Sequence, residues 1–289
     1  MKKEPKGLFH VLGEKEKAEV FWTFPNKNDS HGIYEFEYQK NLLFWIAKAS
    51  GFSHRDLLRI ATVVAFLGER YRDENGNFDF RVSARNFVSG NKEPEVNHSL
   101  GVSILALALL DDGLRNKNLP IENRKLFKKL KKEKRIIVLA GMLHDFCEDK
   151  KGEEHCIQDL LEQIKIPEKE IRSILEVGQV LTRRRTKISR ESSEDYILRV
   201  SQAENPVAPF LKGIDILHNA LSPHKETQKV KYKSCYMEFV LELFPFVKLL
   251  LPDWVKQTIR KENKYLQTVI TKRLLKESLP MGKKLTRKH

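Results

Sequence analysis

The residues best suited to chemistry in this chain are an adjacent histidine and aspartate, His144 and Asp145, with Glu148 and Asp149 close behind them. The pair ends a strongly apolar helical stretch, residues 136–146, which predicts a central core helix. A charge at such a position costs free energy unless it is paired or bound to a metal ion. On a continuing helix, Glu148 and Asp149 would fall one turn after the pair and flank the rim of the same pocket. A helix end with exposed acids is the alternative, since a His-Asp pair alone is a weak signal.

Two further helical segments carry a matching residue. His98 lies at the start of a predicted amphipathic helix. We expect this helix to end at residues 111–113, where two acids precede a glycine. Asp215 lies in the middle of the apolar segment 207–221, and Asn219 follows it by one turn. Two imidazoles and two carboxylates form a mixed nitrogen and oxygen site, which suits Mn²⁺, Fe²⁺ or Zn²⁺ better than Mg²⁺ or Ca²⁺. A divalent ion there would activate water and neutralise phosphate charge.

The order of these residues resembles that of the HD-domain phosphohydrolases. Finer details resemble one branch, the hydrolase domain of the RelA/SpoT proteins and their small stand-alone relatives, which cleave the alarmone (p)ppGpp. The likeness covers about residues 86–222. It rests on residues 90–102 around His98, on an HD-x-x-ED motif at 144–149, and on a Lys-x-x-Asp-x-Leu-His-Asn segment at 212–219.

The resemblance implies a role for each matching residue. Glu148 and Asp149 would position the attacking water and handle its proton. Asn219 would hold the substrate's sugar or the geometry of the site, and Lys92 would lie near the phosphates or the base. Mn²⁺, or another divalent transition metal, would be bound by His98, His144, Asp145 and Asp215.

The activity implied by this resemblance is hydrolysis of guanosine 3′,5′-bis(diphosphate) (ppGpp) to GDP and pyrophosphate. Two positions depart from the family pattern: Ser99 replaces the usual proline, and Ile216 stands where arginine is common. An HD-domain phosphatase or phosphodiesterase acting on another nucleotide is therefore the alternative. A non-enzymatic basic binding protein is a second alternative, which the complete ligand set disfavours.

Arginines at 183 and 184 form a further candidate site. Guanidinium groups match phosphate oxygens, so Arg183 and Arg184 are candidates for substrate binding. A solvated loop explains them equally well, and both interpretations stay open.

These residues must be positioned by helices, because helical periodicity dominates the chain. We expect an all-α fold, an HD-domain helical bundle over residues 35–277 with C-terminal helices, preceded by a short mixed extension (1–34) and followed by a basic tail (278–289). Strand patterns are confined to a short hairpin at 6–12 and 18–24, and a turn is expected at 75–77. Beyond the segments already named, helices are predicted at 157–164, 168–181, 192–203, 231–251 and 254–277.

The charge balance favours anionic partners, because the 289-residue chain carries a net charge of +14. The run at 125–135 has seven basic residues and one acid, and it has no counterpart in the family pattern, so it resembles an insertion with a solvated helix face. A small nucleotide is favoured over nucleic acid as the partner, since no basic run is interleaved with aromatics.

Composition also bears on location. The three cysteines form no CxxC pair, which indicates reduced thiols in a cytoplasmic protein. The most apolar stretch, 239–254, is interrupted by Glu242, Pro245 and Lys248, so no membrane span is expected.

Overall fold

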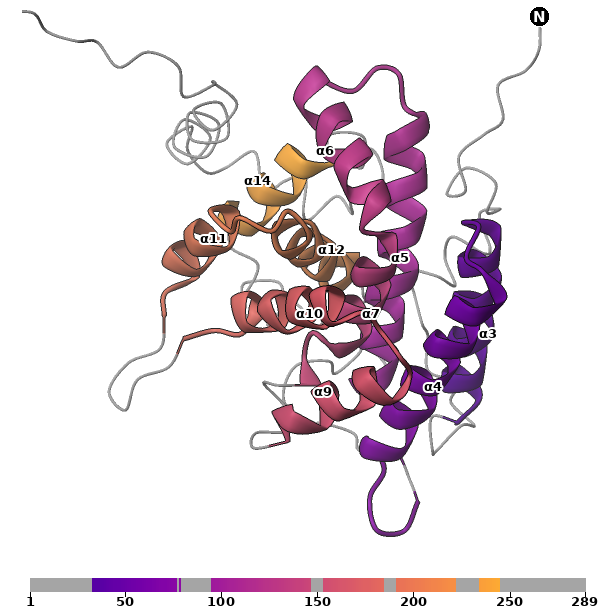
Figure 1. The fold of residues 1–289 in the computed structure, drawn as a ribbon. Helices are drawn as coiled ribbons and strands as arrows, with labels where there is room; N and C mark the ends of the chain where they lie inside the picture. The colour runs from indigo at the N-terminus through magenta and orange to yellow at the C-terminus, as the bar shows by residue number, and fades with distance from the viewer. Residues whose placement is uncertain are drawn as a thin grey trace, which may run out of the picture.

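A computed structural model of the chain describes residues 33–76, 78, 95–146, 153–184, 191–221 and 234–244. Within these ranges the fold is all-α, as predicted, and the nearest approach to a strand is one isolated bridge between Arg72 and Phe78 (Figure 1). The helices are α3 (Ile33–Ala49), α4 (His54–Arg70), α5 (Glu95–Arg115), α6 (Ile121–Lys132), α7 (Lys134–Leu143), α9 (Glu154–Gln163), α10 (Glu168–Leu181), α11 (Ser193–Ser201), α12 (Val207–Leu221) and α14 (Ser234–Leu243).

Two helices, α5 and α7, form the centre of the bundle. Helix α7 is buried from Ile136 to Leu143, which confirms the predicted core helix. The helix predicted at α5 is confirmed, but its expected amphipathic character is wrong, because α5 is buried at every position from 96 to 110. Helices α3, α6, α7 and α12 all pack against α5, and together they cover the faces that the sequence pattern assigned to solvent.

Helix α5 also continues past its expected stop, through residues 111–113 to Arg115. Gly113 ends no helix. It lies against Phe127 of α6, where a Cβ would come within 2.2 Å of the ring. Asp112 is buried rather than solvated. Tertiary packing by α6 therefore extends α5 beyond its local stop signal.

The basic run forms most of α6 and the start of α7. Phe127 and Leu130 are buried on one side of α6, while Lys125, Lys128 and Lys129 are exposed. The run is thus an amphipathic helix of the bundle with a solvated basic face, as the charge pattern predicted. The helix breaks at Glu133, after which α7 begins.

The other predictions vary in precision. The bounds of α10 and α12 match the expected ones, and α9 and α11 differ from theirs by a few residues. The turn at 75–77 is seen in part, since Gly76 has a φ of +78°. The predicted hairpin, the helix at 254–277 and the tail at 278–289 lie outside the described residues.

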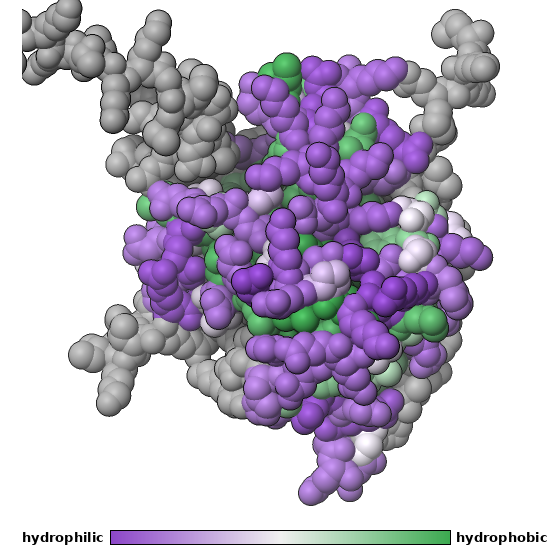
Figure 2. Space-filling model, viewed as in Figure 1, coloured by the Kyte–Doolittle hydropathy of each residue, from purple (hydrophilic) through white to green (hydrophobic). Residues whose placement is uncertain are grey.

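Hydrophilic residues cover most of the face shown in Figure 2, and apolar side chains are visible only in patches between them. None of the described helices is long and apolar enough to cross a membrane.

Candidate metal centre

Close packing of α5 on α7 sets the distance between the two predicted histidine ligands. The Ser103 hydroxyl of α5 donates to the Val138 carbonyl of α7 over 3.1 Å. Opposite it lies Gly141, where a Cβ would come within 2.7 Å of Ser103 Oγ. Glycine permits this approach while the Ser103 hydroxyl keeps its bond to Val138. The two helices thereby bring His98 and His144 together, with ring centroids 5.3 Å apart.

The end of α7 determines how His144 is oriented. Regular helix ends at Leu143, and His144 caps it with helical backbone angles. Its Nδ1 lies 2.7 Å from the Gly141 carbonyl, which can only accept a hydrogen bond. The proton of a neutral ring is therefore on Nδ1, and the Nε2 lone pair is left for a ligand.

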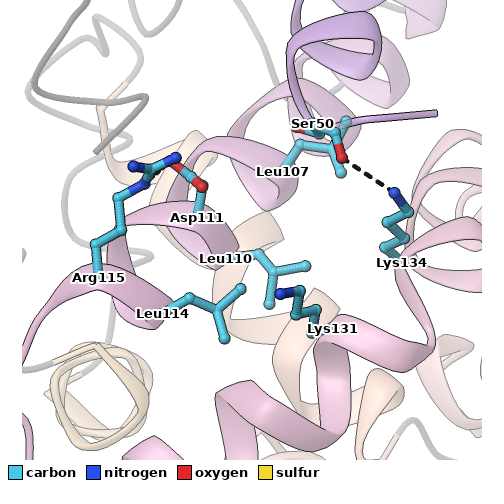
Figure 3. A pocket seen from close by; sticks show the side chains of 8 residues that line it. All are labelled: Ser50, Leu107, Leu110, Asp111, Leu114, Arg115, Lys131 and Lys134. Carbon is cyan, nitrogen blue, oxygen red and sulfur yellow. Dashed lines mark hydrogen bonds and ion pairs between the residues drawn. The ribbon is translucent and has the colours of Figure 1, made fainter. Parts of the chain in front are cut away.

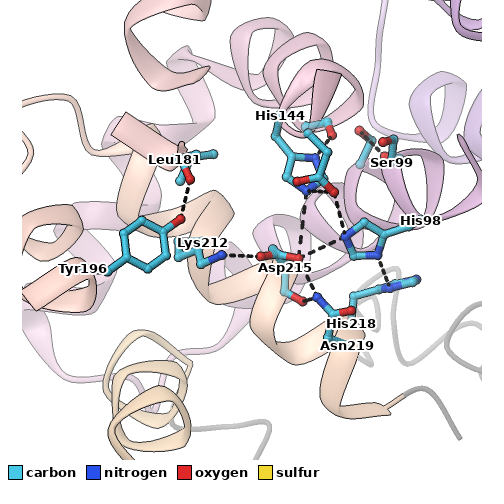
Figure 4. Close-up of polar contacts among 12 residues, drawn as sticks. His98, Ser99, His144, Leu181, Tyr196, Lys212, Asp215, His218 and Asn219 are labelled. Atoms are coloured by element: carbon cyan, nitrogen blue, oxygen red, sulfur yellow. Dashed lines mark hydrogen bonds and ion pairs between the residues drawn. The ribbon is translucent and has the colours of Figure 1, made fainter. Parts of the chain in front are cut away.

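The predicted ligand residues converge in the bundle interior (Figure 4). Candidate donor atoms of His98, His144 and Asp145 all lie within 4.8 Å of one another. Asp145 Oδ2 is 3.2 Å from His144 Nε2 and 3.6 Å from His98 Nε2. Asp215 Oδ1, from α12, lies 3.0 Å from His98 Nε2 and 3.9 Å from His144 Nε2. Residues far apart in the sequence thus form one cluster.

Asp215 is held by two neighbours on its own helix. Lys212 Nζ donates to Oδ2 over 2.6 Å, and Asn219 Nδ2 donates to Oδ1 over 2.7 Å and to the Asp215 carbonyl over 2.9 Å. Both follow from helical spacing, one turn before and one turn after Asp215. Asn219 thus contacts a predicted metal ligand directly. This placement fits the expectation that Asn219 holds the geometry of the site.

Behind His98 lies His218, with 3.0 Å between the two Nδ1 atoms. Both rings are buried. Gly101 of α5 makes room for His218, because a Cβ there would come within 2.3 Å of His218 Nε2. The sequence expectation that His218 has a core or supporting role agrees with this placement.

Charges in the cluster depend on one another. Burial opposes the charged form of His144, but the carboxylates of Asp145 and Asp215 outweigh it and raise its pKa to about 9. Burial likewise opposes ionisation of Asp145, yet the two histidines hold its pKa well below the usual range. For Asp215, Lys212 and His98 outweigh burial and lower the pKa. The metal-free cluster is therefore a network of ionised groups.

The residues present fit a divalent metal ion. His144 Nε2 is buried and makes no hydrogen bond within the described part of the chain. It lies 3.2 Å from Asp145 Oδ2, an ion-pair distance, and both atoms can bind a common metal ion. Imidazole nitrogen and carboxylate oxygen are the ligands that divalent transition metals prefer. The His98, His144 and Asp145 group could thus hold such an ion.

The described cluster does not include every predicted site residue. Glu148, Asp149 and Lys92 are outside the described residues, so their expected roles stay predictions. Arg183 and Arg184 follow α10 and line a separate pocket.

Lys212 and Tyr196 lie near the cluster, and no role was predicted for either from the sequence. The spacing of Lys212 and Asp215, three residues apart on one helix, could have identified the lysine. Tyr196 lies on α11, with its ring 4.9 Å from Lys212 Nζ, and its hydroxyl donates to the Leu181 carbonyl of α10. No local signal connects Tyr196 with Lys212.

No protein-family model matches the chain, and neither the curated proteins nor the solved structures include a significant match.

Proposed function

We propose that the protein is a metal-dependent phosphohydrolase that acts on a nucleotide. The observation that carries this proposal is the buried convergence of His98, His144 and Asp145 on one point, with Asp215 beside them. Gathering four ionisable side chains, three of them buried and Asp145 partly buried, costs free energy, and a bound cation would offset that cost. A basic binding protein has no need for such a cluster, so the non-enzymatic alternative is disfavoured.

In this proposal His98, His144, Asp145 and Asp215 hold a divalent transition metal, with Mn²⁺ the first candidate. Once bound, such an ion activates water and neutralises phosphate charge. Lys212 and Asn219 keep the Asp215 carboxylate in place. Glu148 and Asp149 are the candidates for positioning the water and taking its proton, by resemblance to the HD-x-x-ED motif.

The substrate we propose is ppGpp, cleaved to GDP and pyrophosphate. Water supplies a hydroxyl group to the departing pyrophosphate and a proton to the ribose 3′ oxygen. One observation favours the alternative of another nucleotide. Ile216, where the family often has arginine, is buried, so this position offers no cation to a guanine nucleotide.

A substrate screen with two readouts tests the proposal. Metal-stripped protein is reloaded with Mn²⁺ and given ppGpp, nucleoside monophosphates, cyclic nucleotides and NADP, and pyrophosphate and orthophosphate are measured separately. We expect pyrophosphate from ppGpp. Orthophosphate or cyclic-nucleotide cleavage would favour the alternative substrate. Metal-loaded protein that hydrolyses none of them would contradict the proposal.

Metal content of a variant pair provides the control. Asp215→Asn should lose stoichiometric metal and activity together, since it removes one ligand and its charge. Asp159→Asn changes an exposed aspartate of α9 and should keep both. Full metal content in Asp215→Asn would remove Asp215 from the ligand set.

A further inference from the structure

A second pocket, distinct from the metal centre, lies between α9 and α10 and has a cavity volume of about 480 Å³. We call it the arginine pocket. Helix α9 contributes one wall, helix α10 another, and the segment after α10 closes it. The lining residues are His155, Gln158, Leu175, Gln179, Thr182, Arg183 and Arg184.

The lining of the arginine pocket has the chemistry of an anion site. Apart from Leu175, every lining side chain carries a hydrogen-bond donor, although the Thr182 hydroxyl already donates to the Gly178 carbonyl and one Gln158 amide N–H to Glu162. None of the lining residues that the structure describes is acidic. Each of the two guanidinium groups carries paired donors in a planar fork that matches phosphate oxygens.

Arg183 is held in position before any ligand arrives. Its Nη2 donates to Ser193 Oγ over 3.2 Å, and its Cζ lies 4.9 Å from the Tyr196 ring centroid. Tyr196 is itself buried and tied to α10 through the Leu181 carbonyl. An arginine ordered in this way loses less conformational entropy when it binds an anion.

Another pocket of the structure shows what a structural use of cations looks like (Figure 3). There Arg115 pairs with Asp111 over 2.9 Å, and Lys134 donates to the backbone carbonyls of Ser50 and Gly51. An acid lines that pocket, its arginine pairs with that acid on the same helix, and Lys134 ties the start of α7 to the end of α3. The arginine pocket differs in having no acidic lining residue among those described.

We propose that the arginine pocket binds a phosphate group of a phosphorylated small molecule. Arg183 and Arg184 contact the phosphate oxygens, and His155 with the Gln158 and Gln179 amides completes the set of donors. The volume leaves room for a diphosphate or for the sugar that bears it.

Two sources could supply this phosphate. Tyr196 lies between the pocket and the metal centre, because it contacts Arg183 and also Lys212, which donates to Asp215. One candidate source is the uncleaved phosphorylated end of a nucleotide whose other end is at the metal centre. The second is a separate phosphorylated effector. Both share the same recognition chemistry, and the experiment separates them.

Calorimetry with inorganic pyrophosphate tests the site without relying on catalysis. The protein is stripped of metal with a chelator and dialysed, so that a bound ion cannot attract the probe. We expect wild-type protein to bind pyrophosphate. Removing one guanidinium in Arg184→Gln should weaken binding roughly tenfold, and Arg183→Gln/Arg184→Gln should weaken it further.

Matched variants keep this test interpretable. Arg184 is exposed, so Arg184→Gln alone should leave the melting temperature unchanged even if loss of Arg183 loosens Tyr196. Arg172→Gln changes an exposed arginine of α10 outside the pocket and should bind pyrophosphate like wild type. No binding by wild-type protein, or equal binding by the double variant, would overturn the proposal.

Kinetics on the metal-loaded protein then identify the source. If the phosphate is the uncleaved end of the substrate, Arg184→Gln raises KM for a nucleotide phosphorylated at both ends and not for one lacking the second end. If it belongs to an effector, KM stays constant and the response to added pyrophosphate is lost instead. Either result supports the site. The binding result stands even if no nucleotide is hydrolysed, so the two proposals fail separately.

Discussion

His98 has two different neighbours at its two ring nitrogens. Nε2 faces Asp215 Oδ1 and Nδ1 faces His218 Nδ1, each at 3.0 Å. In a neutral, metal-free ring, a proton on Nε2 satisfies the Asp215 carboxylate and His218 donates to Nδ1; when His98 is protonated, its Nδ1–H donates to His218 instead. A metal at Nε2 requires the proton to be on Nδ1, so that His218 becomes the acceptor. His218 can serve both states because its ring can exchange tautomers.

Replacing His218 with phenylalanine therefore tests whether it supports the metal ligand. His218→Phe keeps a ring of similar size but removes the acceptor for His98 Nδ1–H. We expect the affinity for Mn²⁺ to fall about 10- to 100-fold, as measured by metal titration. The same replacement at exposed His54 should leave the affinity unchanged. Wild-type affinity in a folded His218→Phe protein would show that His218 only fills space.

At the scale of the elements, the approach of α5 to α7 depends on Gly141 and Ser103. Gly141→Ala would place a Cβ within 2.7 Å of Ser103 Oγ and should destabilise the fold by about 1 to 3 kcal/mol. It should also weaken metal binding, because α5 carries His98 and α7 carries His144. Urea denaturation and metal titration measure the two effects.

A second substitution provides the control for this pair. Ser103→Ala removes the hydroxyl that the new methyl group meets, at the cost of its hydrogen bond to Val138, about 1 kcal/mol. The double variant should be more stable than the sum of the single effects predicts, since the clash is gone. Strict additivity would mean that the clash is relieved elsewhere.

Arg135 joins the start of α7 to two other helices. Its Nη1 donates to Asp56 of α4 over 2.8 Å, and its Nε donates to Glu170 of α10 over 2.6 Å. Partial burial opposes ionisation of Asp56, but hydrogen bonds from Ser53, Arg135 and Arg59 outweigh it and lower its pKa to about 2. These contacts fix the helix that carries His144 from the end opposite the metal centre.

The Asp56 pKa predicts how stability depends on acid. A carboxyl group with a lowered pKa in the folded state stabilises it fully above the unfolded value of 3.8, and this contribution is lost as the pH falls toward 2. The free energy of unfolding should fall by about 2 kcal/mol as Asp56 is protonated. The free energy of unfolding of wild type and of Asp56→Asn is measured between these pH values. It should fall with pH more steeply in wild type, because the variant has no carboxyl group to protonate. Parallel curves would contradict it.

For the whole molecule, the sequence predicted helices best where local signals agree with packing. The bounds of α10 and α12 are punctuated by Pro167 and Pro206 and match the structure. The environment of α5 could not be predicted, because burial on all sides depends on helices distant in sequence. The candidate ligand types were identifiable from spacing and resemblance, and Arg183 and Arg184 were candidates from the sequence. The contact of Tyr196 with Lys212 and the α9 wall of the arginine pocket arise from tertiary packing.

Metal binding should stabilise the entire fold, since α5, α7 and α12 all contribute to one centre. At a free Mn²⁺ concentration of one hundred times the dissociation constant, the gain is about 2.7 kcal/mol. The melting temperature should rise with Mn²⁺ and return on chelation. Mg²⁺ should have a smaller effect at equal concentration, because it prefers oxygen ligands. No response to any divalent transition metal would argue against a metal centre.

The four clustered side chains differ in how far solvent reaches them. His98 has no exposed side-chain surface and His144 has 4%, whereas Asp215 has 10% and Asp145 has 25%. The histidine rings are thus closed to solvent, and Asp145 is the most accessible of the four side chains. Replacement of one bound ion by another should accordingly begin at Asp145, which solvent can reach, and the imidazoles should be the last ligands to be released.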